Sequence, residues 1–136
     1  MKSIKYFFQF LIILFLFIIF KILGLRLSSK ISSKILILFG PFFRSQKITN
    51  SNILRAFPNL NQNDVKKISK KMWGNYGRIL SEYVFIKEFR KSSPKYNFNI
   101  KGQEVLEKIK NDNEPVIFVS GHFNNFELMA MHIEKS

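Results

Sequence analysis

Hydrophobic residues cluster most densely near the start of the chain, where Tyr6 to Leu25 read YFFQFLIILFLFIIFKILGL. Three residues interrupt the run: Gln9, Lys21 and Gly24. A helix of about 20 residues is about 30 Å long, the thickness of a bilayer's hydrocarbon core. A secretory signal peptide is the alternative, but no alanine of the usual small-residue cleavage site appears before Ala56. We therefore predict an uncleaved transmembrane anchor within residues 1–27.

Two short helices are predicted after the anchor. Residues 28–39 place apolar and basic side chains on different sides of a helix, as at a membrane interface, and the Gly40-Pro41 pair is expected to end it. Residues 49–57 carry apolar side chains three and four positions apart, and Pro58 stops that helix.

The strongest helical pattern runs from about Asn63 to Lys87, with Asn63 or Asn61 as its cap. Its predicted apolar face consists of Val65, Ile68, Met72, Tyr76, Ile79 and Tyr83. Four lysines occupy its first turns: Lys66, Lys67, Lys70 and Lys71. Positive charge there opposes the helix dipole, so these lysines form either a solvated face or a contact for an anionic partner. Residues 28–93 are therefore predicted to be a basic helical region.

The pattern changes after Pro94. Residues 96–100 alternate apolar and polar side chains, as in a strand, and residues 115–119 form a continuous apolar run typical of a strand covered on both faces. Short helices are predicted at 103–111 and 124–134. This order predicts that residues 94–136 begin an α/β sheet.

Charge supports a membrane location. The chain has 22 Lys and Arg against 9 Asp and Glu, a formal net charge of +13. Residues 1–81 hold fourteen of the cations and a single acid, Asp64, whereas residues 82–136 hold eight of each sign. A basic patch suits nucleic acid or an anionic membrane, and its position beside the apolar run favours the membrane. The absence of cysteine and the presence of only two histidines argue against a metal site.

Candidate chemistry lies where the apolar run of residues 115–119 gives way to the last predicted helix. His122 follows Gly121 there, and Glu127 comes five residues later. A carboxylate folded back toward the imidazole would fix its tautomer and stabilise the protonated ring, an arrangement suited to general-base chemistry on an alcohol. The spacing alone is also compatible with a packed turn histidine. His132 is interpreted as a structural or surface residue.

The segment VIFVSGHFNNFELMAMHI resembles the active-site segment of the bacterial lipid A biosynthesis acyltransferases, whose pattern is an apolar strand followed by G-H-F-G-N-W-E. The matching residues are Gly121, His122, Phe123, Asn125 and Glu127. Asn124 replaces the glycine and Phe126 the tryptophan. Upstream, SNILRAFPNL (residues 51–60), YGR to Glu82 (residues 76–82) and NIKG (residues 99–102) are similar to further segments of the family, in the same order.

The resemblance implies a catalytic dyad of His122 and Glu127, with Asn125 in substrate binding. It implies transfer of a fatty acyl chain from acyl carrier protein to a hydroxyl of a lipid A precursor, with no cofactor or metal. The expected partners are the carrier protein, the lipid A precursor and membrane lipids, but not nucleic acid. The expected location is the bacterial inner membrane, with one span and the catalytic portion facing the cytoplasm.

Family members continue for about as long again, so the chain is expected to be an N-terminal portion with an incomplete catalytic domain. Two other interpretations stay open. One is an acyltransferase that acts on a different lipid acceptor. The other is a membrane-anchored remnant without activity, in which the histidine and glutamate match is accidental or decayed.

Overall fold

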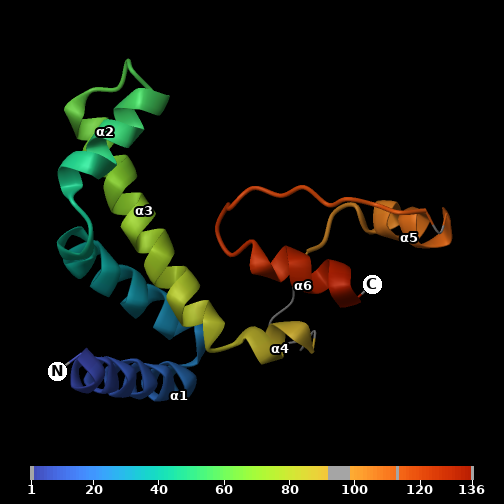
Figure 1. The fold of residues 1–136 in the computed structure, drawn as a ribbon, viewed down its shortest axis with the longest axis horizontal. Coiled ribbons are helices and arrows are strands. Elements are labelled where there is room, and N and C mark those ends of the chain that lie inside the picture. The colour runs from blue at the N-terminus through green and yellow to red at the C-terminus, as the bar shows by residue number, and fades with distance from the viewer. Residues whose placement is uncertain (1, 92–98, 113, 136) are drawn as a thin grey trace. The chain divides into compact units, whose positions relative to one another are not determined.

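The computed structural model describes residues 2–91, 99–112 and 114–135, which divide into two compact units, Met1–Val84 and Phe85–Ser136. Every regular element among these residues is a helix (Figure 1). The first unit contains α1 (Lys2–Phe43), α2 (Gln46–Ala56) and α3 (Gln62–Tyr83). The second contains α4 (Ile86–Arg90), α5 (Gln103–Asp112) and α6 (Glu127–Lys135).

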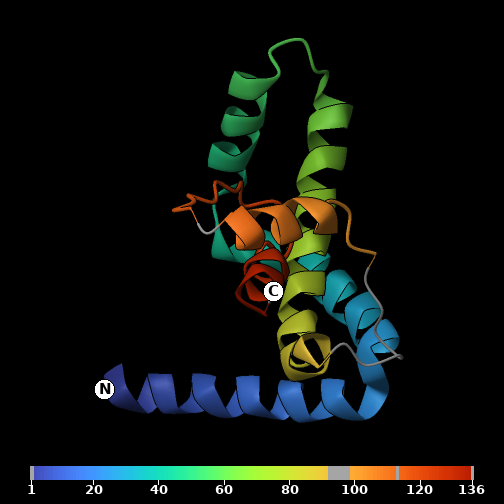
Figure 2. The same cartoon turned by 90° about the vertical axis from the view of Figure 1, so that its right-hand side faces the viewer.

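Helix α1 contains a sharp kink at Gly24, whose φ of 75° and ψ of 164° are not helical. The two halves of α1 therefore run in clearly different directions (Figure 2). A kink leaves carbonyl groups without their helical partners. The Ser28 hydroxyl compensates, because its oxygen lies 2.7 Å from the carbonyl oxygen of Phe20 and 2.8 Å from that of Gly24.

The half of α1 before the kink contains most of the predicted anchor. The most apolar window of Ile4–Phe43 has a mean hydropathy of 2.6 and is only 6% buried. A helix that is hydrophobic on all sides and uncovered by protein has the length and composition to cross a membrane. By length and composition, this property agrees with the predicted span.

The half of α1 after the kink packs closely against α3 through small residues. Ser28, Ser32 and Ser33 are buried on α1, and Gly74, Gly77 and Ser81 are buried on α3. A Cβ atom at Gly77 would collide with the Ser32 carbonyl group and lie 2.7 Å from Ser33 Cα. Small side chains let two helix backbones approach this closely.

The predicted helix end at Gly40-Pro41 is wrong, because α1 continues to Phe43 with Pro41 inside it. Gly40 does not break the helix, and its lack of a side chain allows α3 to pack against α1. A Cβ atom there would collide with the ring of Trp73, which is buried on α3.

The predicted apolar face of α3 is wrong in part. Of its six residues, Val65 is fully buried and three others are half-buried, but Tyr76 is 52% exposed and Tyr83 is 38% exposed. The face that packs on α1 is the one that carries the glycines and serines. The prediction failed because it ranked side chains by hydrophobicity, whereas this contact selects them by size.

The predicted helix boundaries around α2 and α3 are mostly confirmed. Helix α2 ends at Ala56, just before Phe57 and Pro58. The side chain of Asn61 caps α3 by accepting a hydrogen bond of 3.0 Å from the Asp64 backbone N–H. Helix α3 ends at Tyr83, before the expected Lys87, and the short α4 follows.

The predicted α/β sheet is wrong, since no strand occurs in the described ranges 2–91, 99–112 and 114–135. Residues 115–119 lack regular structure, and Ile117 and Val119 are 88% and 92% exposed instead of covered on both faces. An extended apolar segment becomes a strand only when a neighbour supplies the ladder of hydrogen bonds. Of the other predicted strand, residues 96–98 lie outside the described residues, and residues 99 and 100 have no regular structure.

Candidate functional site

The motif from Gly121 to Glu127 forms the turn that leads into α6. The Phe123 N–H donates a hydrogen bond of 2.8 Å to the Gly121 carbonyl oxygen, which tightens the chain around His122. The Asn125 carbonyl oxygen then accepts from the Leu128 N–H at 3.2 Å, and this bond opens the helix. Local backbone hydrogen bonds therefore hold the motif in a defined turn.

Asn124 explains why α6 begins three residues later than predicted. Its φ of 49° places it in the left-handed region, which a right-handed helix cannot contain. Asparagine and glycine adopt this conformation at the lowest cost. The family-like pattern has glycine here, so the departure at Asn124 preserves the backbone geometry.

Replacing Asn124 tests this geometry. Asn124→Gly is expected to leave stability nearly unchanged, whereas Asn124→Val should destabilise the turn by about 1–2 kcal/mol, because a β-branched residue at positive φ is strained. Hydrogen exchange of the α6 backbone amides is the measurement. Asn111→Val, at an exposed position of α5, is the matched control. Similar exchange in both valine variants would contradict the left-handed turn.

His122 contacts the aromatic ring that replaces the family's tryptophan. The His122 and Phe126 ring centroids are 4.2 Å apart with an interplanar angle of 56°. An aromatic neighbour restricts the imidazole without needing a hydrogen-bond donor. Phe126 therefore orients His122 by packing, while His122 itself is exposed.

Glu127 is the first residue of α6 and is exposed. A carboxylate in the first turn is favourable next to the positive end of the helix dipole. In the described part of the chain the structure does not show His122 hydrogen-bonded to Glu127, so the dyad remains a prediction. Asn125, which lies between them in the sequence, is half-buried, and its assignment to substrate binding likewise stays a prediction.

His132 has a structural contact. Its Nε2 atom lies 3.0 Å from Gln103 Oε1, which joins α6 to the start of α5. The Arg90 guanidinium also reaches Glu134 of α6, with Nη2 2.8 Å from Oε1, but both side chains are more than half exposed, so this ion pair stabilises little. No group of three potential metal ligands occurs among the residues that the structure describes.

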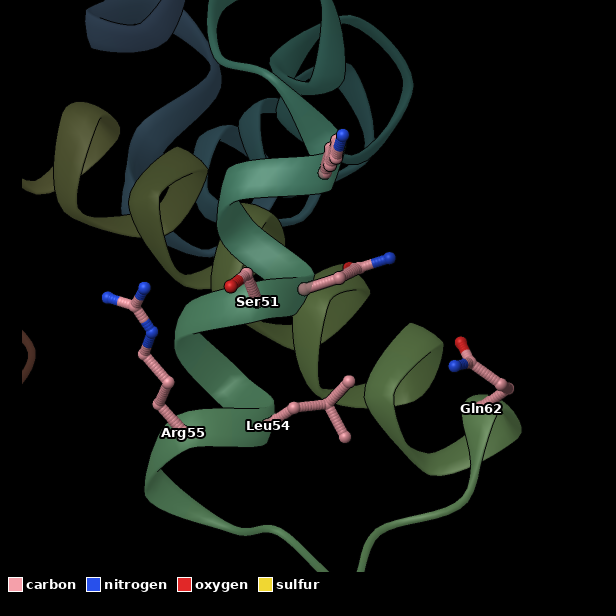
Figure 3. A pocket seen from close by; sticks show the side chains of 6 residues that line it. Ser51, Leu54, Arg55 and Gln62 are labelled. Atoms are coloured by element: carbon pink, nitrogen blue, oxygen red, sulfur yellow. The ribbon is translucent and has the colours of Figure 1, made fainter.

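Two hollows in the first unit were not foreseen from the sequence. The larger, about 470 Å³, lies between α2 and the start of α3 (Figure 3). It is lined by Lys47, Asn50, Ser51, Leu54, Arg55 and Gln62. Three of these residues belong to the family-like segment at 51–60, and this resemblance was the one feature of the sequence that pointed to the hollow. The second hollow, about 240 Å³, lies between α1 and α3.

The α1–α3 contact also explains another family-like segment, residues 76–82. Gly77 permits the close approach of the helices, and Arg78 Nη1 donates a hydrogen bond of 3.3 Å to Ser33 Oγ. Both residues therefore join α3 to α1.

Comparison with known proteins identifies the chain's family. No curated protein and no solved structure matched the chain. The sequence model for "Bacterial lipid A biosynthesis acyltransferase" matches residues 1–136. The match covers the predicted anchor, the helical region and the His122 motif together, and the chain therefore belongs to the bacterial lipid A biosynthesis acyltransferase family.

Proposed function

We propose that the protein transfers a fatty acyl chain from an acyl carrier protein thioester to a hydroxyl group of a lipid A precursor. The observation that carries the proposal is the exposed His122 on an ordered turn within a chain that the family model matches throughout. An exposed imidazole can reach a substrate hydroxyl, and histidine ionises near neutral pH.

In the proposed reaction, His122 removes the proton from the acceptor hydroxyl as its oxygen attacks the thioester carbonyl carbon. The new C–O bond forms, the C–S bond breaks, and the imidazolium returns its proton to the departing thiolate. Ester and free carrier thiol are the products, so no oxidant or reductant is required. The carboxylate of Glu127 would stabilise the imidazolium while it carries the proton.

The test is acyl transfer by membranes from cells that express the protein. Labelled acyl carrier protein thioester is supplied with a lipid A precursor, with a glycerophosphate lipid or with an aminoacyl lipid. Product formed only from the lipid A precursor supports the proposed acceptor. Transfer to another acceptor alone would replace it, and no transfer to any acceptor would favour a remnant without activity.

We further propose that the apolar half of α1 spans the inner membrane and leaves the catalytic portion in the cytoplasm. The protein should stay in the membrane fraction after high-salt or carbonate washing, because apolar burial does not depend on salt. Immunoblotting of the washed membranes measures this. Release by salt would indicate a peripheral protein, and cleavage beyond Lys34 by protease added to the periplasmic side would reverse the orientation.

A further inference from the structure

The hollow between α1 and α3, which we call the α1–α3 groove, combines positive charge with apolar lining. Four cationic side chains of α3 line it: Lys67, Lys70, Lys71 and Arg78. Ile37 of α1 and Gly74 of α3 supply apolar surface beside them. The groove lies wholly within the first unit, whereas His122 belongs to the second.

The positive charge in the groove is only partly compensated. Lys67 Nζ lies 3.2 Å from Asp64 Oδ1, and Arg78 donates its hydrogen bond to the neutral hydroxyl of Ser33. Lys70 and Lys71 are exposed, and within the described ranges neither forms an ion pair. Among the described residues, no acidic side chain lines the groove.

These cations do not serve the helix that carries them. Like charges three and four positions apart on a helix repel one another, and cations near its start oppose the dipole. A bound anion would relieve both effects. The sequence left open a merely solvated basic face, but the groove places this charge beside apolar surface, and that combination suits an amphiphile.

The neighbouring surface favours a lipid as the occupant. The half of α1 that borders the groove follows directly from the apolar anchor. In its last turns, Leu38 is 64% exposed, Phe42 is 84% exposed and Phe43 is 80% exposed. Apolar side chains exposed on a helix that also borders a cationic groove are typical of a segment at the membrane interface, where anionic headgroups and acyl chains are both within reach.

We propose that the α1–α3 groove binds an anionic glycerophospholipid of the surrounding bilayer. Lys70, Lys71 and Arg78 contact its phosphate, and an acyl chain lies along Ile37. This lipid is neither acyl donor nor acceptor, so the proposal goes beyond the acyl transfer and does not depend on it.

The test titrates the full protein, in a neutral detergent, with short-chain phosphatidylglycerol. Trp73 is the chain's single tryptophan, and its ring packs from α3 against Gly40 of α1, so its fluorescence reports on this region. Lys70→Gln and Lys71→Gln should each weaken binding about fivefold, and the double variant about 30-fold. Lys70→Arg should retain binding.

Lys66→Gln is the matched control, because Lys66 is exposed on the same turns of α3 but does not line the groove. Its affinity should change less than about twofold. Circular dichroism should be the same for all variants, and His122→Ala should bind phosphatidylglycerol like the unaltered protein. Normal phosphatidylglycerol binding by His122→Ala would show that lipid binding in the groove does not depend on the proposed acyl transfer.

Four results would overturn the proposal. The first is an equal loss of affinity in Lys66→Gln. The second is equally tight binding of phosphatidylcholine with the same chains, and the third is equally tight binding of inorganic phosphate. The fourth is binding of acyl carrier protein or lipid A precursor that requires Lys70 and Lys71 while phosphatidylglycerol binding does not. That result would assign the groove to a reaction partner.

Discussion

His122→Ala is expected to reduce acyl transfer to about one per cent or less while the protein remains in the membrane. Loss of a general base typically costs about 10²–10⁴-fold in rate. The exposed ring contributes little packing beyond its contact with Phe126. Transfer from labelled acyl carrier protein is the measurement, with membrane content checked by immunoblotting. Near-normal transfer would exclude the general-base mechanism.

The partner of the histidine is tested separately. Glu127→Gln keeps the shape of the side chain but removes the charge that would stabilise the imidazolium. It should therefore lower turnover strongly and affect acceptor binding less. Glu127→Asp should retain more activity than the glutamine variant if a carboxylate near the ring is what matters.

His132→Ala is the matched histidine control. It removes the contact with Gln103, so a stability loss of about 1 kcal/mol is expected, with transfer nearly retained. If His132→Ala were as inactive as His122→Ala at equal protein level, the assignment of His122 and Glu127 would be wrong.

Gly77→Leu is expected to have the largest effect on stability. Even one added carbon would collide with the Ser32 carbonyl group and with Ser33 Cα, and backbone atoms cannot rotate away as a side chain can. Inserting a larger side chain into a tight contact costs about 1–3 kcal/mol, and a leucine here should reach at least the upper end. Thermal unfolding followed by Trp73 fluorescence measures the loss.

Two comparisons make this result specific. Gly74→Ala should cost less, because its added carbon would meet the movable side chains of Ser33 and Ile37 at 2.9 and 3.1 Å. Lys66→Leu introduces the same side chain at an exposed position of α3 and should change stability by about 0.5 kcal/mol or less. Equal melting of Gly77→Leu and Lys66→Leu would contradict the close approach of α1 and α3.

The sequence determined the features whose signals are local or strongly periodic. An apolar run as long as a bilayer is thick can form a helix without any partner, so the long apolar first half of α1 was readable directly. Pro58 and the Asn61 cap act on their own neighbours, and the boundaries between α2 and α3 were predicted for that reason. The motif around His122 was also readable, because its residues follow one another along the chain.

Only the tertiary structure decided how the helices pack. The serines of α1 and the glycines of α3 have no hydrophobic signal, yet they form the contact, because close packing of two backbones depends on small size. The sequence pattern at Gly40 is that of a helix breaker, but in the fold Gly40 makes room for the ring of Trp73. Residues 115–119 have a strong hydrophobic signal that the fold does not use. Their composition favours a strand, but they have no regular structure. A strand exists only when another segment pairs with it, and pairing depends on the whole fold.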